Sequence, residues 1–354
     1  MTVTRGTWRR ASLASVGMLA WAAAAGAGEV AVDVGLDQPI MVERGSLDRI
    51  ALFIEMGTNT AVQSTVTGAQ EEAAKRGITV DVFDARFDVA RQVNQMQNAL
   101  LGDYDAWIVA AIEGEQICDM AARQAPEAGI VVVVVTMSIC GNSVNEGDEM
   151  WSPGTLTYIG GNESPNSFQR IMEQAVMDRP GPQQIAVLTG QPLHPITLAF
   201  DTALARFLAE HPEVDLVATH RTDYSPEMNQ SKVQTTLQAH PELDAIISVY
   251  TNMSKGAVPA LQSAGLLGQV RLYEAGGTEW SVDALRSGEI AATTGYYRGT
   301  AAATAVRVLL DAFEGKAVER TYLNDGHPLL PGQEYGQVAI ITAANVDDYT
   351  PQSP

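Results

Sequence analysis

The stretch Arg49–Met56, RIALFIEM, runs through five consecutive apolar residues before it reaches a carboxylate. Residues 62–76, VQSTVTGAQEEAAKR, follow with helical spacing of their apolar positions, and Gly77 then leads to a second β-branched stretch at 79–83. A short continuous apolar run is typical of a strand that is buried on both faces, as in parallel sheets. The strand–helix–strand order therefore predicts the opening unit of a doubly wound α/β fold.

The same alternation continues along most of the chain. A loop rich in Gly, Ser, Asn and acidic residues interrupts it at 138–153, and strands and helices then alternate again from 155 to 341. The 354 residues exceed the usual size of a domain with a single core. Two successive α/β units of similar size therefore predict two lobes.

The first 27 residues have the order of a secretory signal peptide. Three arginines, at positions 5, 9 and 10, precede an apolar stretch at 11–25, and the small residues AGA at 25–27 fit a cleavage site. The apolar stretch is too short for a comfortable membrane span. We expect residues 1–27 to be removed and the mature protein to be periplasmic.

Composition narrows the class of partner. The formal net charge is -20, and so acidic a surface disfavours nucleic acid and anionic membranes. The two cysteines, Cys118 and Cys140, favour a disulfide because their number is even and export leads to an oxidising compartment, although two buried thiols remain the alternative. Five scattered histidines supply no closely spaced zinc ligands, so we expect neither a metal nor a cofactor.

A series of short motifs follows the first strand in a recognisable order. They are IAL at 50–52, GAQEEA at 68–73, GIVV at 129–132, HPELDAI at 240–246, GAVPALQSAG at 256–265, GEIAAT at 288–293 and ITAANVD at 341–347. Together they resemble the ribose-type periplasmic sugar-binding proteins, which share their fold with the core of LacI-type repressors. The resemblance extends over almost the whole mature chain, residues 50–347.

The resemblance implies the type 1 periplasmic binding protein fold, in which two doubly wound parallel-sheet lobes are joined by a three-strand hinge. The chain then passes between the lobes three times. On this basis the N-terminal lobe is expected at 48–157 plus 297–317, and the C-terminal lobe at 158–296 plus 318–347.

Ligands of open α/β sheets bind beyond the carboxyl ends of the strands, and two lobes set such ends face to face across a cleft. The resemblance places a sugar-binding amide at Asn59 and a C-terminal-lobe aromatic residue at Tyr224. It also implies an aromatic pair after Asn59, where this chain has Ala61 and Val62, and most of the family's other sugar-contacting residues are replaced too. The candidate ligand-binding residues are Glu55, Asn59, Glu113, Tyr224, Tyr250, Glu274, Trp280 and Tyr296.

This candidate set is acidic and aromatic, which suits a cation through carboxylate pairing and cation–π contact. An amine is therefore a candidate ligand beside a sugar or polyol, and ordinary packing or solvation is the alternative for each residue. His194 is interpreted as a solvated loop histidine, and residues 295–298 as a hinge crossing in competition with ligand contact.

The function that follows is capture of a small polar ligand by a monomeric solute-binding protein that delivers it to an ABC importer. The alternative is a ligand-sensing subunit that signals to a membrane histidine kinase or chemoreceptor. An enzyme is disfavoured because the sequence has no G-x-S-x-G elbow, HExxH pair or P-loop, so we assign no catalytic residue.

Overall fold

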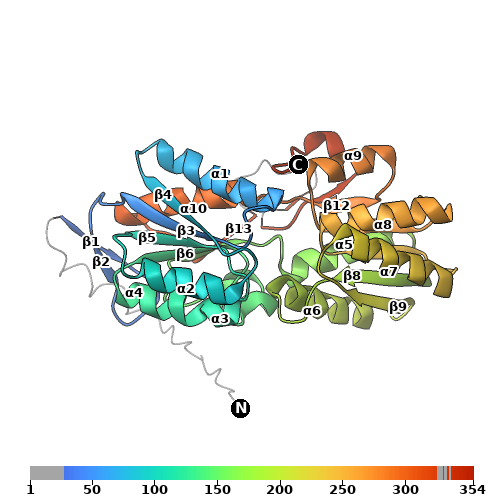
Figure 1. Cartoon of the computed structure of the whole chain (residues 1–354), viewed down its shortest axis with the longest axis horizontal. Helices are drawn as coiled ribbons and strands as arrows, with labels where there is room; N and C mark the ends of the chain where they lie inside the picture. The colour runs from blue at the N-terminus through green and yellow to red at the C-terminus, as the bar shows by residue number, and fades with distance from the viewer. Residues whose placement is uncertain (1–27, 325–329, 331–332, 335) are drawn as a thin grey trace, which may run out of the picture.

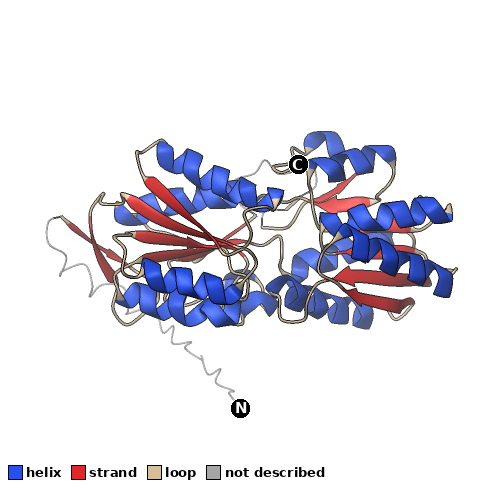
Figure 2. Cartoon of the chain, viewed as in Figure 1, coloured by secondary structure: helices blue, strands red, loops and turns tan. Residues whose placement is uncertain are grey.

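The computed structural model describes residues 28–324, 330, 333–334 and 336–354, so the predicted signal peptide lies outside the described residues. Two α/β lobes lie side by side along the long axis of the molecule (Figure 1). Each contains a six-stranded, mainly parallel sheet with helices on both faces (Figure 2). The predicted fold class is therefore confirmed.

The sheet of the first lobe has the strand order β13-β7-β6-β5-β3-β4, and all its neighbouring strands are parallel. Its strands are β3 (Arg49–Ile54), β4 (Thr79–Asp84), β5 (Ala106–Val109), β6 (Val131–Thr136), β7 (Thr157–Gly160) and β13 (Thr321–Leu323). Successive residues of β3 enter different cores, Leu52 on one face and Phe53 on the other. Burial on both faces is the reason that β3 is apolar throughout.

Two layers of helices enclose this sheet. On one face, α1 (Thr60–Ala74) packs against α10 (Arg298–Phe313), so closely that a Cβ on Gly68 would clash with the carbonyl of Gly299. The other face is covered by α2, α3 and α4 (Figure 1). These span Val89–Ala99, Gly114–Asp119 and Ala125–Glu127, with a π-helical turn at Met120–Gln124 between the last two.

The sheet of the second lobe has the order β14-β12-β11-β10-β8-β9, and only β14 is antiparallel to its neighbour. Its strands are β8 (Gln183–Thr189), β9 (Val214–Arg221), β10 (Ala245–Ser248), β11 (Arg271–Glu274), β12 (Ala292–Thr294) and β14 (Ile340–Thr342). Its helices are α5 (Pro165–Asp178), α6 (Pro195–Glu210), α7 (Pro226–Ala239), α8 (Thr251–Ala264) and α9 (Glu279–Ser287).

Some elements differ from the sequence-based expectation. A β-hairpin of β1 (Glu29–Val32) and β2 (Ile40–Glu43) precedes the first lobe, where no element was predicted. Strand β7 extends the first sheet to Gly160, beyond the expected limit at 157. Strand β13 also joins that sheet, although 318–347 was expected in the second lobe. Pairing at a sheet edge decides the place of so short a strand, and a local residue pattern does not contain that information.

Short 3₁₀ turns complete the described elements, at Asn142–Val144, Gly147–Met150 and Val346–Asp348. Cys118 in α3 is joined to Cys140 after β6 by a disulfide, the pairing that the cysteine count favoured. None of the helices among the described residues has the length and apolarity needed to cross a membrane.

Candidate functional site

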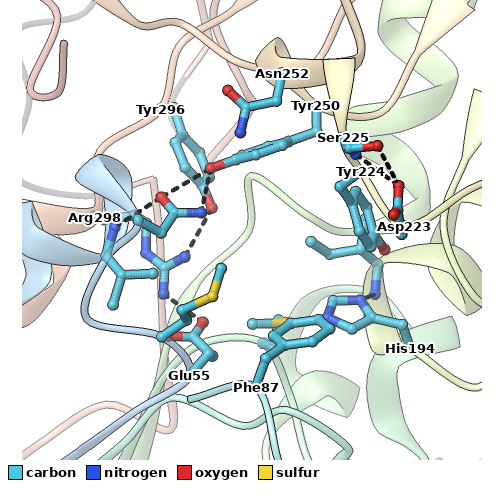
Figure 3. A pocket seen from close by; sticks show the side chains of 15 residues that line it. Glu55, Phe87, His194, Asp223, Tyr224, Ser225, Tyr250, Asn252, Tyr296 and Arg298 are labelled. Atoms are coloured by element: carbon cyan, nitrogen blue, oxygen red, sulfur yellow. Dashed lines mark hydrogen bonds and ion pairs between the residues drawn. The ribbon is translucent and has the colours of Figure 1, made fainter. Parts of the chain in front are cut away.

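A cavity of about 340 Å³ lies between the two lobes, where the carboxyl ends of their strands face each other (Figure 3). Glu55 follows β3 and Met137 follows β6 in the first lobe. From the second lobe, Tyr224 follows β9 and Tyr250 follows β10. Sheet topology therefore brings together side chains that are nearly 200 residues apart in sequence.

Five of the eight predicted ligand-binding residues line this cavity. They are Glu55, Asn59, Tyr224, Tyr250 and Tyr296. The other three, Glu113, Glu274 and Trp280, are not among the lining residues.

The three residues outside the cavity have other partners. Glu113 precedes α3 and accepts a hydrogen bond from the side chain of Gln116. Glu274 is fully buried within the second lobe, where Oε1 accepts hydrogen bonds from Thr293 and from the start of α9, and burial raises the pKa of its carboxyl. Trp280 lies under Lys255, whose Nζ is 5.8 Å from its ring centroid. The acidic character expected of the site is therefore reduced to one buried carboxylate and one at the rim.

Ten lining residues were not among the eight candidates, and the interpretation of His194 as a solvated loop residue was wrong, since it is 7% exposed and lines the cavity. The apolar ones are Met56, Val62, Phe87, Met137 and Ile196, and the polar ones are His194, Asp223, Ser225, Asn252 and Arg298. Most of them stand in the first turn of a helix or directly after a strand. The strand-end rule reaches that neighbourhood, but which side chain turns toward the other lobe depends on the tertiary fold.

A succession of aromatic rings runs along one wall of the cavity and crosses between the lobes. Phe87 of the first lobe stacks on His194 of the second, with ring centroids 5.7 Å apart and an interplanar angle of 24°. His194 meets Tyr224 at 5.7 Å, and Tyr224 meets Tyr250 edge-on at 6.2 Å. Figure 3 shows these rings facing the cavity.

The last of these rings is bonded back to the first lobe. The Tyr250 hydroxyl lies 2.7 Å from Nδ2 and 2.9 Å from Oδ1 of Asn59. Asn59 is also the N-cap of α1, since Oδ1 accepts the backbone N–H groups of Ala61 and Val62. The helix cap therefore fixes the orientation of the amide that reaches across the cavity.

The opposite wall holds a buried ion pair. Arg298, at the start of α10, places Nη2 2.5 Å from Oε1 of Glu55, and both side chains are almost fully buried. Its Nε donates to the Thr65 hydroxyl at 3.1 Å, and Nη1 donates to the Tyr296 hydroxyl at 3.3 Å. Tyr296 in turn donates to Oε1 of Glu163 at 2.5 Å. This cluster links the cavity wall to two of the segments that cross between the lobes.

Burial sets the protonation states of the site. It raises the pKa of the Glu163 carboxyl to about 7 and that of the Tyr224 hydroxyl to about 12. It lowers the pKa of His194 to about 4, an effect to which Arg298 adds. Nδ1 of His194 accepts the backbone N–H of Ile196, so the neutral ring carries its proton on Nε2. Near neutral pH both the histidine and the tyrosine are therefore uncharged.

Two of the lining rings are held by unusual backbone. Phe87 and Tyr224 have φ angles of 58° and 65°, in the left-handed region that costs a residue with a Cβ about 1 kcal/mol or more. Phe87 is also 45% exposed, so packing alone does not account for its position. Strain of this kind clusters at ligand sites, and no local sequence pattern signals it here.

Comparison with known proteins identifies the family. A profile of the periplasmic binding protein domain matches residues 50–317, most of the chain. The chain belongs to the periplasmic binding protein domain family. Among curated members, a ribose import binding protein of Salmonella typhimurium is 23% identical over 291 residues, which is 82% of this chain and 93% of that protein. A ribose import binding protein of Bacillus subtilis is 21% identical over 273 residues, 77% of this chain and 84% of that protein.

Solved structures of periplasmic binding proteins confirm the fold. The Caulobacter myo-inositol binding protein aligns with a TM-score of 0.72 and 20% identity over 87% of this chain and 97% of its own. A periplasmic solute-binding protein of Actinobacillus succinogenes, solved with D-allose, aligns with a TM-score of 0.71 and 20% identity over 85% of this chain and all of its own. The predicted type 1 fold and the ribose-type resemblance are both confirmed.

Proposed function

We propose that this chain is the periplasmic solute-binding component of an ABC importer, and that it captures one small molecule in the cavity between its lobes. The observation that carries the proposal is the cavity itself, which aromatic and polar side chains of both lobes line. Its volume of about 340 Å³ suits a molecule of monosaccharide size. The similar proteins of Salmonella typhimurium and Bacillus subtilis are ribose import binding proteins, which favours an importer over a sensory subunit.

The mechanism proposed is capture by closure of the lobes. In the structure the lobes touch at Phe87–His194 and at Asn59–Tyr250, so a ligand between these contacts is enclosed on two sides. The chain passes between the sheets after β7, after β12 and after β13, and rotation about these segments opens the cavity. A ligand that contacts both walls stabilises the closed form, because it binds that form more tightly than the open one.

Binding without covalent chemistry is the proposed outcome, with the protein acting as a monomer. His194 is the residue in the cavity whose ordinary pKa suits a general base near neutral pH. Its Nδ1 is already occupied by a backbone N–H, and burial lowers its pKa to about 4. A histidine in that state does not take up a proton at neutral pH, so we assign its ring to packing in the cavity wall.

Ligand-induced closure is the direct test. Leu101 in the first lobe and Met177 in the second are 90% and 64% exposed, so Leu101→Cys and Met177→Cys provide labelling sites away from the cavity. We expect a ligand that raises the melting temperature also to shorten the distance between the two labels. Tyr250→Phe should reduce this closure, because it removes the hydrogen bonds to Asn59. Tight binding with an unchanged interlobe distance in the labelled protein would refute the proposal.

A further inference from the structure

The walls of the cavity are mainly carbon. Met56, Val62 and Phe87 from the first lobe face Ile196 and the ring of Tyr224 from the second. A sugar or cyclitol carries a hydroxyl on nearly every carbon, and each hydroxyl that loses water without gaining a partner costs about 1–3 kcal/mol. Surfaces of this kind favour a ligand with few hydroxyls, since removal of apolar surface from water lowers the free energy.

Several polar groups at the cavity already have protein partners. The Asn59 amide bonds to Tyr250 and to the first turn of α1. Arg298 donates to Thr65, Tyr296 and Glu55. At the rim, Oδ1 of Asp223 accepts the backbone N–H and the hydroxyl of Ser225. A polyhydroxylated ligand would compete with these bonds for its own partners.

The charges in the buried wall are paired. Glu55 faces Arg298 at 2.5 Å, so neither group is left to attract a ligand ion of the opposite sign. Asp223 is solvent-exposed at the rim, where water screens it. This arrangement argues against the cation suggested by the acidic residues of the sequence, because Arg298 occupies the position that a bound cation would take beside Glu55.

Two buried polar atoms of lining residues make no hydrogen bond of normal geometry among the described residues. One is Oε2 of Glu55, an acceptor on the first lobe. The other is the hydroxyl of Tyr224 on the second lobe, although Thr197 lies near enough to influence its pKa. Both atoms expose less than 1 Å² of surface, so the buried wall offers a polyhydroxylated ligand no free partner at these two positions.

From these observations we propose that the ligand is a compact, uncharged ring compound with few hydroxyl groups and a largely apolar body. The inference rests on the proposed solute-binding function and narrows it. The ring packs between Phe87 of the first lobe and Ile196 of the second. Contact with both lobes at once is what couples such a ligand to closure.

The test compares rings of similar size that differ in hydroxyl content. Residues 28–354 are unfolded and refolded to remove bound solute, and are then titrated calorimetrically with cyclohexanol, benzyl alcohol and hydroquinone, and in parallel with myo-inositol and D-ribose. We expect the first three to bind at least about tenfold more tightly than the last two, since unpaired hydroxyls lower affinity by about that factor each.

Two variants locate the binding in the cavity. Phe87→Ala should weaken binding of benzyl alcohol about tenfold through loss of ring contact, whereas Leu101→Ala, at a 90% exposed position away from the cavity, should leave it unchanged. Equal effects of Phe87→Ala and Leu101→Ala on binding would show that the ligand does not bind in the cavity.

The remaining outcomes separate the two proposals. Tighter binding of myo-inositol or D-ribose overturns the ring-compound inference and leaves the solute-binding function intact. Binding of choline in preference to every uncharged ring does the same in favour of a cation. Absence of any binding or closure across all three classes overturns both proposals.

Discussion

Replacement of Arg298 by methionine should be among the most damaging single changes in this protein. Methionine keeps much of the side-chain length, so the change removes the charge with little change in packing. Arg298 and Glu55 are 6% and 4% exposed as side chains, with 2.5 Å between the charged atoms. Without the guanidinium, the Glu55 carboxylate is buried without compensation.

Loss of one partner from a buried ion pair costs about 3–5 kcal/mol, because the remaining charge keeps its desolvation penalty. We therefore expect Arg298→Met to lower the free energy of unfolding by that amount at pH 8. The double variant Glu55→Gln/Arg298→Met should recover part of the stability, because no unpaired charge remains.

Urea denaturation followed by circular dichroism measures these differences. Arg123→Met is the matched control, since Arg123 pairs with Asp119 on an exposed helix surface where both side chains are more than half exposed. That variant should leave the midpoint unchanged. A loss below about 1 kcal/mol in Arg298→Met, or no recovery in the double variant, would show that the pair is solvated and that the reasoning is wrong.

Three further predictions concern pH, covalent structure and the cavity. Burial raises the pKa of Glu163 to about 7, so its contribution to stability is present at low pH and is lost as pH rises through 7. Glu163→Gln should remove this pH dependence of the unfolding free energy, which amounts to about 3 kcal/mol at most. Urea midpoints that vary between pH 5 and 8 in the variant as they do in the parent protein would contradict this. The Cys118–Cys140 disulfide spans 22 residues, so Cys118→Ala/Cys140→Ala should lower the free energy of unfolding by about 3 kcal/mol; denaturation with and without reductant checks this, and equal stability would contradict it. A Cβ on Gly190 would clash with the Tyr224 hydroxyl, so Gly190→Ala should displace that ring and weaken ligand binding in calorimetric titrations; full affinity would show that the ring is not part of the site.

The sequence alone was sufficient for the architecture. Runs such as 50–54 and 131–135 are apolar at every position, and burial on both faces of a parallel sheet explains them without reference to any other part of the chain. The strand-end rule also led to Glu55, Asn59 and Tyr250, because the end of a strand can be read from its local pattern, whereas the family resemblance led to Tyr224.

Other features depended on contacts between distant segments. The local pattern predicts that Arg298 starts a helix, and only the packing of α10 against α1 and β6 brings it to Glu55, 243 residues away. Phe87 follows an exposed edge strand, and its left-handed backbone turns the ring toward His194 of the other lobe. The contact of Arg298 with Glu55 pairs the charges of the cavity, and the contact of Phe87 with His194 completes its aromatic wall.

Local pattern therefore determined which segments form strands and helices, since the spacing of apolar residues reflects burial along one element. The tertiary structure decided which polar groups are already paired and which remain for a ligand. Glu274 illustrates the difference: by sequence it ends a strand like Glu55, but neighbouring hydroxyls enclose it within one lobe, whereas Glu55 lines the cavity between the lobes. The packing of whole helices and strands in three dimensions sets the partners of each side chain, and the spacing of apolar residues along the sequence contains no information about that packing.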